Sequence, residues 1–121
     1  MSVFSSIPEE EYLLKGDYFF VIFDRYPVSP GHVLIISFSE KTDYFELSTE
    51  EKLELTAMID QTKVFLAERY TPAGYNIGMN CGVAAGQTVM HFHCHVIPRF
   101  VGDMEDPRGG VRGVIPGKQG Y

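Results

Sequence analysis

Three of the four histidines in this chain fall within five residues, as His91, His93 and His95. The residues that alternate with them are apolar, namely Phe92, Cys94 and Val96. Strict alternation of this kind is typical of a half-buried strand, so we expect a strand over 89–98. Successive side chains on a strand point to opposite faces, so the three imidazoles would share one face and the apolar side chains the other. A row of titratable rings opposite an apolar face favours a functional site over a core.

Three interpretations of the histidine row are open from the residues alone. The rings could be surface side chains of an exposed strand, or core histidines whose nitrogens have hydrogen-bond partners. Three histidines on one face nevertheless call for a common explanation. They could bind a metal, but His91 and His95 would lie ~13 Å apart on a straight strand, and no HExxH or paired acidic motif adds ligands. They could perform nucleophilic catalysis, because a neutral imidazole attacks phosphorus well and is abundant at neutral pH.

The remaining patterns predict an α+β fold. Runs rich in β-branched and aromatic residues over 17–23 and 32–37 are expected to be strands, paired antiparallel because their connection is short. A third strand is expected over 73–80. The residues from Gly102 onward are rich in glycine, proline and charge, so we expect one domain over 1–121 with an extended tail over 101–121.

One long helix is expected between the second and third strands. Ser48 would be its N-cap, with Glu51 three residues later completing a capping box. The helix should end near Arg69–Tyr70, before Thr71-Pro72. Its apolar stripe is expected to consist of Leu53, Leu55, Ala57, Met58, Ile59, Val64, Phe65 and Leu66. A short turn or helix is expected near Pro8.

Charge and cysteine content narrow the class of protein. The net charge of −6 argues against a general nucleic-acid-binding surface. No apolar run approaches the ~20 residues of a membrane span, and no secretory leader is visible, so neither a membrane nor a secreted role is expected. Cys81 and Cys94 are expected to be reduced, buried thiols of a cytoplasmic protein.

The loop that precedes the histidine row carries neutral hydrogen-bond donors. Because the whole chain is acidic, a phosphate-bearing ligand would have to be met by such local groups. The candidates are Asn80, Gln87 and Thr88.

A resemblance to a known family rests on His91-Phe92-His93-Cys94-His95-Val96-Ile97. This segment resembles the HφHφHφφ motif of the histidine triad (HIT) superfamily of nucleotide hydrolases and transferases. Residues 23–36 resemble the nucleoside-binding segment and following strand of that family, and 86–89 resemble its lead-in to the triad. The similarity covers about 20–100, which is most of the chain.

The resemblance implies a fold and a catalytic group. The fold would be an antiparallel sheet of about five strands with one long and one short helix, in a protein that forms homodimers. His93 would attack the α-phosphorus of a nucleotide and carry a transient nucleotidyl–histidine intermediate, which water then hydrolyses. His95 would assist the leaving group, His91 would orient the network, and His32 would anchor it from the neighbouring strand.

The resemblance also implies ligand contacts. Asp24 would hold the ribose hydroxyls, and Asn80 and Gln87 would bind the phosphate chain. The base could be clasped by Phe4, Ile7 and Ile22. No protein-bound metal or other cofactor is required, and Mg²⁺ would enter, if at all, on the substrate's phosphates.

Residues 98–103 resemble the dinucleoside polyphosphate hydrolases and the fragile histidine triad group, although Asp24 stands where that group usually has asparagine. The tail over 105–116 resembles bacterial members. The expected function is hydrolysis of a dinucleoside polyphosphate with release of a nucleoside monophosphate. The alternatives are a nucleoside phosphoramidate (AMP-lysine type) hydrolase and a nucleotide-binding regulatory protein with incidental turnover. Arg108 and Arg112 would meet distal phosphates or pair with acidic residues of the tail.

Overall fold

Strand β5 (His93–Arg99) lies between β3 (Val33–Ser37) and β4 (Gly74–Gly78), so His93 and His95 are on an inner strand next to the β4 edge of the sheet. The computed structural model describes residues 1–121. It confirms the α+β class, with five antiparallel strands in the order β1-β2-β3-β5-β4. The other elements are β1 (Leu14–Lys15), β2 (Phe19–Phe23), α1 (Thr49–Tyr70) and the 3₁₀ turns η1 (Val3–Ser6), η2 (Glu9–Glu11), η3 (Tyr44–Glu46), η4 (Val83–Ala85) and η5 (Gly110–Val114).

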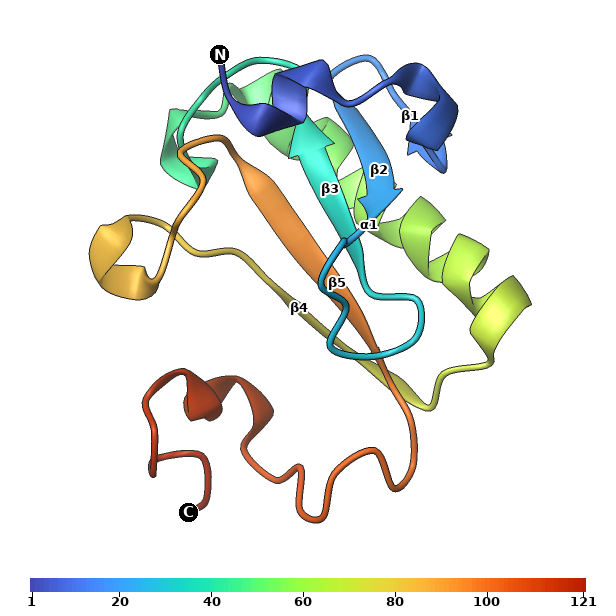
Figure 1. The fold of residues 1–121 in the computed structure, drawn as a ribbon, viewed down its shortest axis with the longest axis vertical. Helices are drawn as coiled ribbons and strands as arrows, with labels where there is room; N and C mark the ends of the chain where they lie inside the picture. The colour runs from blue at the N-terminus through green and yellow to red at the C-terminus, as the bar shows by residue number, and fades with distance from the viewer.

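The two faces of the sheet are covered by different parts of the chain (Figure 1). Helix α1 covers one face, where a cluster of 11 buried residues includes Phe92, Cys94 and Val96. The N-terminal segment covers part of the other, where Phe4, Ile7 and Tyr12 pack against a smaller cluster. Residues 33–37 of β3 are buried throughout because both faces are covered.

The strand register places two histidines on the face opposite α1. His93 pairs with Ile36, and His95 pairs with Leu34. Ile36 and Leu34 belong to the smaller cluster, and residues directly opposite each other on neighbouring strands share a face. The expected division of the row, with rings on one face and apolar side chains on the other, is therefore confirmed for His93 and His95.

The long helix agrees with its sequence signals at both ends. The Ser48 side chain accepts from the Glu51 backbone, and the Glu51 side chain accepts from the Ser48 backbone, which is the expected capping box. The expected stripe was wrong at three positions, since Ala57 is exposed and Leu53 and Val64 are 69% and 60% exposed. The buried positions are spaced three or four residues apart, which turns Leu53 and Val64 away from the sheet. They are Glu51, Leu55, Met58, Thr62 and Leu66.

Other expectations changed in detail. The short N-terminal helix is the three-residue turn η2, and β5 begins at His93, four residues later than expected. Both cysteines are free, but only Cys94 is buried, while Cys81 is half-buried. No helix of the chain combines the length and apolar composition needed to cross a membrane.

The C-terminal tail leaves the sheet after β5 (Figure 1), and its Gly110 comes close to the Asn76 side chain of β4. It is largely exposed and contains only the turn η5. The expected pairing of Arg108 and Arg112 with tail acids was wrong, because both guanidinium groups lie over the Tyr121 ring, at 5.8 and 4.8 Å. Asp103 instead pairs with Arg99, at 2.7 Å.

Candidate active site

A cavity of about 700 Å³ opens on the face of the sheet opposite α1. This volume is in the range of small-molecule sites. The cavity combines apolar and polar walls. Its apolar lining includes Val3, Phe4, Ile7, Ile22 and Leu34, and its polar lining includes Asp24, Arg25, Asn80, Thr88, His93 and His95. Five of the eight site residues expected from the sequence line this cavity, and a sixth, His32, lies behind them with its ring against His95.

His93 presents an unprotonated nitrogen. Its Nδ1 lies 2.8 Å from the backbone carbonyl of His91. A carbonyl oxygen can only accept, so Nδ1 carries the proton and Nε2 keeps its lone pair. His93 lines the cavity, so the ring that carries this lone pair is accessible to a molecule bound there. An imidazole in this tautomer is a nucleophile that needs no base to activate it.

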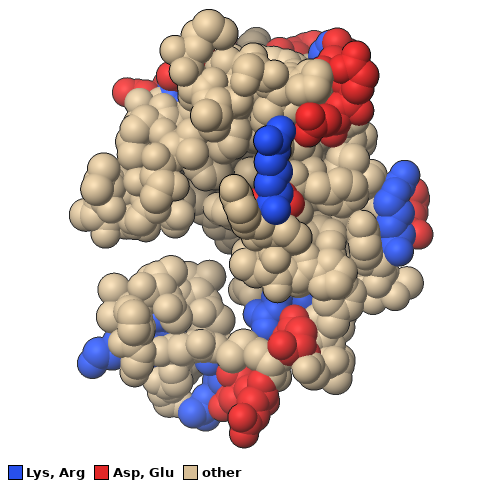
Figure 2. All heavy atoms as spheres, in the orientation of Figure 1, with Lys and Arg blue, Asp and Glu red and all other residues tan.

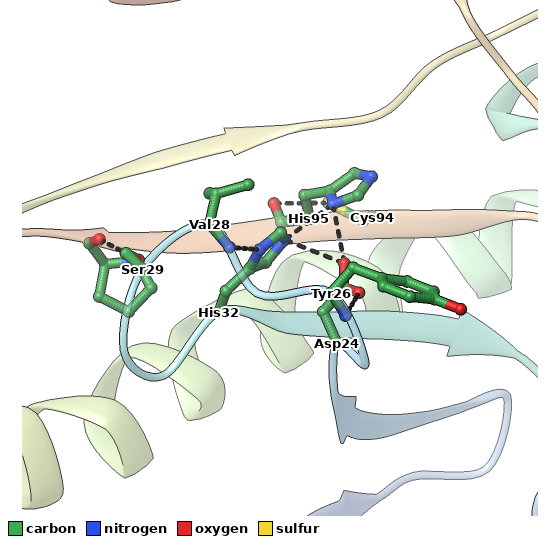
Figure 3. Close-up of polar contacts among 8 residues, drawn as sticks. Asp24, Tyr26, Val28, Ser29, His32, Cys94 and His95 are labelled. Carbon is green, nitrogen blue, oxygen red and sulfur yellow. Dashed lines mark hydrogen bonds and ion pairs between the residues drawn. The ribbon is translucent and has the colours of Figure 1, made fainter.

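His95 is held in the opposite tautomer by His32 (Figure 3). The backbone amide of Val28 donates to Nδ1 of His32 at 3.1 Å, so His32 carries its proton on Nε2. That Nε2 lies 2.9 Å from Nδ1 of His95 and donates to it. His95 is left with its proton on Nε2. It can therefore act as a hydrogen-bond donor beside the lone pair of His93, whose ring centroid is 5.4 Å away.

The local backbone fixes the position of His32. Gly31, directly before it, has a φ of +86°, a conformation that favours glycine. A Cβ at this position would also lie 3.0 Å from the Tyr70 ring. The Pro30-Gly31 turn therefore brings the loop back so that Val28 can cap the His32 ring.

Burial keeps both members of the His32–His95 pair neutral. Burial lowers the pKa of His95 to about 4, with further lowering by the neighbouring His93 and His32 and partial opposition from Asp24. Burial also lowers the pKa of His32, again opposed by Asp24. At neutral pH the pair is therefore a chain of neutral hydrogen bonds.

Asp24 lies beside this pair at the cavity wall. Its Oδ1 accepts from the Tyr26 backbone amide at 2.8 Å, and its Oδ2 lies 3.3 Å from Nε2 of His32 and 3.9 Å from Nδ1 of His95. Ligand atoms of these three side chains lie within 4.8 Å of one another, as in a metal site. However, a histidine that binds a metal through Nε2 carries its proton on Nδ1, and the Val28 amide already points at Nδ1 of His32. The donor pattern fits a hydrogen-bond chain better than a ligand set.

His91 is placed differently from the other two members of the row. It is 1% exposed and does not line the cavity. Its Nε2 donates to the Ser37 carbonyl at 2.7 Å, and its Nδ1 accepts from the Ser2 hydroxyl. Both ring nitrogens of His91 are therefore occupied by hydrogen bonds. His91 contributes to the reaction only through its backbone carbonyl, which accepts a hydrogen bond from His93.

The loop residues expected at the phosphates divide into two groups. Asn80 and Thr88 line the cavity. Gln87 is buried, and its amide donates to the Thr42 and Val89 carbonyls and accepts from the Gly82 amide, at 2.6, 3.1 and 2.8 Å. These bonds hold the Gln87 side chain inside the loop. Gln87 therefore stabilises the loop and is not part of the loop's surface.

Sequence reasoning missed two contributors to the site. Arg25 is the only cationic side chain that lines the cavity, and its position next to Asp24 was a usable signal. The Val28 amide, which sets the His32 tautomer, is a backbone group and leaves no signal in residue types.

Comparisons with known proteins identify the family of this chain. A family model described as HIT domain matches residues 7–102. The AP-4-A phosphorylase of Mycobacterium tuberculosis is 31% identical over 106 residues, which are 83% of this chain and 54% of the relative. The asymmetrical bis(5'-nucleosyl)-tetraphosphatase of Schizosaccharomyces pombe is 34% identical over 80 residues, 66% of this chain and 44% of the relative. The chain thus spans about half the length of these curated relatives.

A solved structure matches over a larger share of its length. It is a zinc-bound histidine triad family protein from Mycobacterium smegmatis, with a TM-score of 0.77 and 30% identity, covering 87% of this chain and 79% of that one.

Proposed function

The chain belongs to the HIT domain family, and on that premise we propose that it cleaves a dinucleoside polyphosphate at an α-phosphate and releases a nucleoside monophosphate. The observation that carries the proposal is the opposite protonation of two neighbouring rings. His93 offers a lone pair on Nε2, and His95 offers a proton on Nε2. A nucleophile next to a fixed donor is the arrangement that displacement at phosphorus requires.

The reaction would proceed in two displacements. Nε2 of His93 attacks the α-phosphorus, and the bond to the bridging oxygen breaks, with its electron pair leaving on the departing polyphosphate. His95 donates a hydrogen bond to the developing negative charge. Water then attacks the same phosphorus, the bond to Nε2 breaks, and the water proton is released to solvent as the monophosphate departs. The AP-4-A phosphorylase among the relatives makes inorganic phosphate an alternative acceptor worth including in assays.

The protonation state of His95 favours a phosphate leaving group over an amine. A departing polyphosphate is stable as an anion and needs only stabilisation of its charge. An amine leaving group needs a full proton. A His95 whose pKa is lowered to about 4 by burial and its neighbours is neutral at pH 7, so it is a good hydrogen-bond donor but holds no spare proton.

The cavity walls support a nucleotide ligand. Apolar residues such as Ile22 and Leu34 suit a base, and the Asp24 carboxylate suits ribose hydroxyls. Arg25 would meet the phosphate chain, since its single ion pair, with Glu11 at 3.6 Å, is exposed and weak. On the face shown in Figure 2 the charged side chains form small separate groups, which supports a small-molecule substrate over nucleic acid.

We further propose that the protein holds no metal for this reaction, with Mg²⁺ at most accompanying the substrate. The His32 tautomer supports this, because its Nε2 proton occupies the position of a ligand lone pair. Overnight dialysis against a chelator should leave the activity of the protein unchanged. Loss of activity that zinc restores would contradict the proposal.

A homodimer in the cytoplasm completes the proposal. Strand β4 is an edge strand with Ile77 exposed, and Leu53 and Val64 of α1 are exposed apolar side chains. Such surfaces support pairing of two copies through β4 and α1. Light scattering after gel filtration would measure the mass in solution.

The activity is tested by product analysis. Ap4A, Ap3A and an AMP–lysine phosphoramidate would be incubated separately with the wild-type protein and with His93→Ala. We expect the wild-type protein to release AMP from the polyphosphates faster than from the phosphoramidate, and His93→Ala to be inactive but still bind AMP. Faster release from the phosphoramidate would favour the alternative substrate class. Turnover by His93→Ala at the wild-type rate would overturn the role of His93.

A further inference from the structure

The N-terminal segment 2–7 forms part of the cavity wall. Val3, Phe4 and Ile7 line the cavity, and Phe4 and Ile7 also pack on the smaller apolar cluster of the sheet. The segment contains the short turn η1, which has no buried residue of its own. A segment with so little internal structure keeps one position only if other parts of the chain hold it.

Glu40, which follows β3, holds the segment from one side. Its Oε1 accepts from the Ser2 backbone amide at 2.9 Å, and its Oε2 accepts from the Ser5 hydroxyl at 2.9 Å. The hydrogen bonds from Ser5 and Ser2 lower the pKa of Glu40, so the carboxylate is ionised and accepts through both oxygens at neutral pH. Glu40 itself does not line the cavity.

His91 holds the segment from the other side. The Ser2 hydroxyl donates to Nδ1 of His91, and the same oxygen accepts from the Phe4 amide at 3.1 Å. Ser2 therefore ties η1 to a buried ring that is fixed in turn to the Ser37 carbonyl. The Phe4 ring then lies edge-on to His91 and His93, with centroids 5.5 and 5.0 Å apart.

We propose that Glu40 is a positioning residue for nucleotide binding, which with His91 clamps residues 2–7 against the cavity. The proposal rests on the proposed function, because it assigns the wall to the nucleotide. It also gives the first histidine of the row a defined task, which is to anchor the segment rather than to touch the substrate.

The clamp should affect binding more than chemistry. Releasing residues 2–7 removes the Phe4 wall and leaves the bond from His93 Nδ1 to the His91 carbonyl in place. The nucleophile therefore keeps its tautomer. Only the fraction of molecules with the segment in position would bind nucleotide at full affinity, so the apparent affinity falls by that fraction.

The test compares Glu40→Ala with Glu54→Ala. Glu54 is a matched control, because its carboxylate also accepts two donors from one segment, the Asp17 and Tyr18 amides at 2.9 and 2.7 Å, away from the cavity. We expect Glu40→Ala to raise KM for Ap4A about tenfold with kcat within about twofold of wild type, and Glu54→Ala to change neither. Glu40→Gln keeps one acceptor oxygen and should fall between wild type and Glu40→Ala.

Two further measurements separate the clamp from the enzyme activity. Amide hydrogen exchange in residues 4–7 should quicken in Glu40→Ala and not in Glu54→Ala, whether or not the protein turns over nucleotide. Phe4→Ala should also raise KM, and the double variant Phe4→Ala/Glu40→Ala should be no worse than Phe4→Ala alone, because both act through one wall.

Unchanged exchange in Glu40→Ala would overturn the clamp. Faster exchange with an unchanged KM would show that the segment does not serve binding. Additive effects in the double variant would show that Glu40 does not act through the Phe4 wall, which would also overturn the proposal. A wild-type protein that neither binds nor cleaves nucleotide would instead overturn the proposed function, and with it the nucleotide-binding role of the clamp. The exchange data would still decide whether Glu40 holds the segment.

Discussion

Nε2 of His32 lies 2.9 Å from Nδ1 of His95, and this contact decides which nitrogen of His95 carries a proton. Because the Val28 amide occupies the other nitrogen of His32, the direction of the bond is set by the backbone. The three histidines of the row therefore have three different roles, although they look equivalent in the sequence. His93 has a free lone pair, His95 has a free donor, and His91 has neither.

Replacing His32 should impair the chemical step. In His32→Phe the Nδ1 of His95 loses its donor, so the His95 proton is no longer confined to Nε2. We expect kcat to fall roughly 100-fold with little change in the dissociation constant for AMP. Ser29→Ala is the control from the same loop, since it removes only the bond from Ser29 to the Pro98 carbonyl. Equal losses in the two variants would mean that loop integrity, not the donor, matters.

Stability should fall in mild acid because of the His32–His95 pair. Burial and the neighbouring histidines lower the pKa of His95 from 6.5 to about 4 in the folded protein. The unfolded chain therefore takes up a proton first as the pH falls, and the free energy of unfolding declines from about pH 6.5 toward 4. The loss would reach roughly 3 kcal/mol.

Urea unfolding between pH 7.5 and 4.5 measures this slope. This pH window excludes the titration of Glu51. Burial raises the pKa of Glu51, but hydrogen bonds from Lys41, Ser48 and Ser39 outweigh burial and lower the pKa to about 2. The contribution of Glu51 to stability is therefore lost only below pH 4.5. His95→Asn should flatten the slope. An equally steep slope in this variant would assign the effect to other groups.

Arg25 should set the preference for long phosphate chains. It is the only cation in the cavity wall, so Arg25→Ala should raise KM for Ap4A about tenfold and leave AMP binding nearly unchanged. Steady-state kinetics and calorimetry measure the two quantities. Arg69→Ala, which removes an exposed guanidinium from the end of α1, is the matched control. A parallel loss of AMP binding in Arg25→Ala would place the guanidinium at the nucleoside instead.

Thr62→Val should stabilise the fold. Thr62 is 1% exposed, and its hydroxyl has no hydrogen-bond partner, so replacing that hydroxyl by a methyl group removes a desolvation cost of about 1 kcal/mol. Thr56→Val is the control, because the Thr56 hydroxyl is exposed and bonds the Lys52 carbonyl. Thermal unfolding of both variants measures the difference. A destabilised Thr62→Val would indicate a partner for the hydroxyl.

Local signals in the sequence were sufficient for much of the fold. The capping box of Ser48 and Glu51 needs only residues three apart, and it was predicted correctly. The alternating apolar residues placed Phe92 and Cys94 on the helix-covered face. The prediction that Leu53 and Val64 face the core was wrong, because apolar composition alone does not define which side of a helix meets the sheet.

The unequal roles of the histidines could not be predicted, because they depend on contacts between distant segments. The Ser2 hydroxyl reaches His91 across 89 positions of sequence, and Gln87 is held by Thr42. Strand β5 begins only at His93, while the Phe92 amide just before it bonds the Lys41 carbonyl. Residue types and spacing carry none of this information.

The nucleophilic role of His93 is tested most directly by mapping the covalent intermediate. The protein would be mixed with Ap4A, quenched rapidly in alkaline denaturant to preserve the phosphorus–nitrogen bond, digested, and analysed by mass spectrometry. We expect one adenylyl group, carried by His93 and absent from His93→Ala. Turnover without an adduct, or an adduct on His91 or His95, would contradict the account.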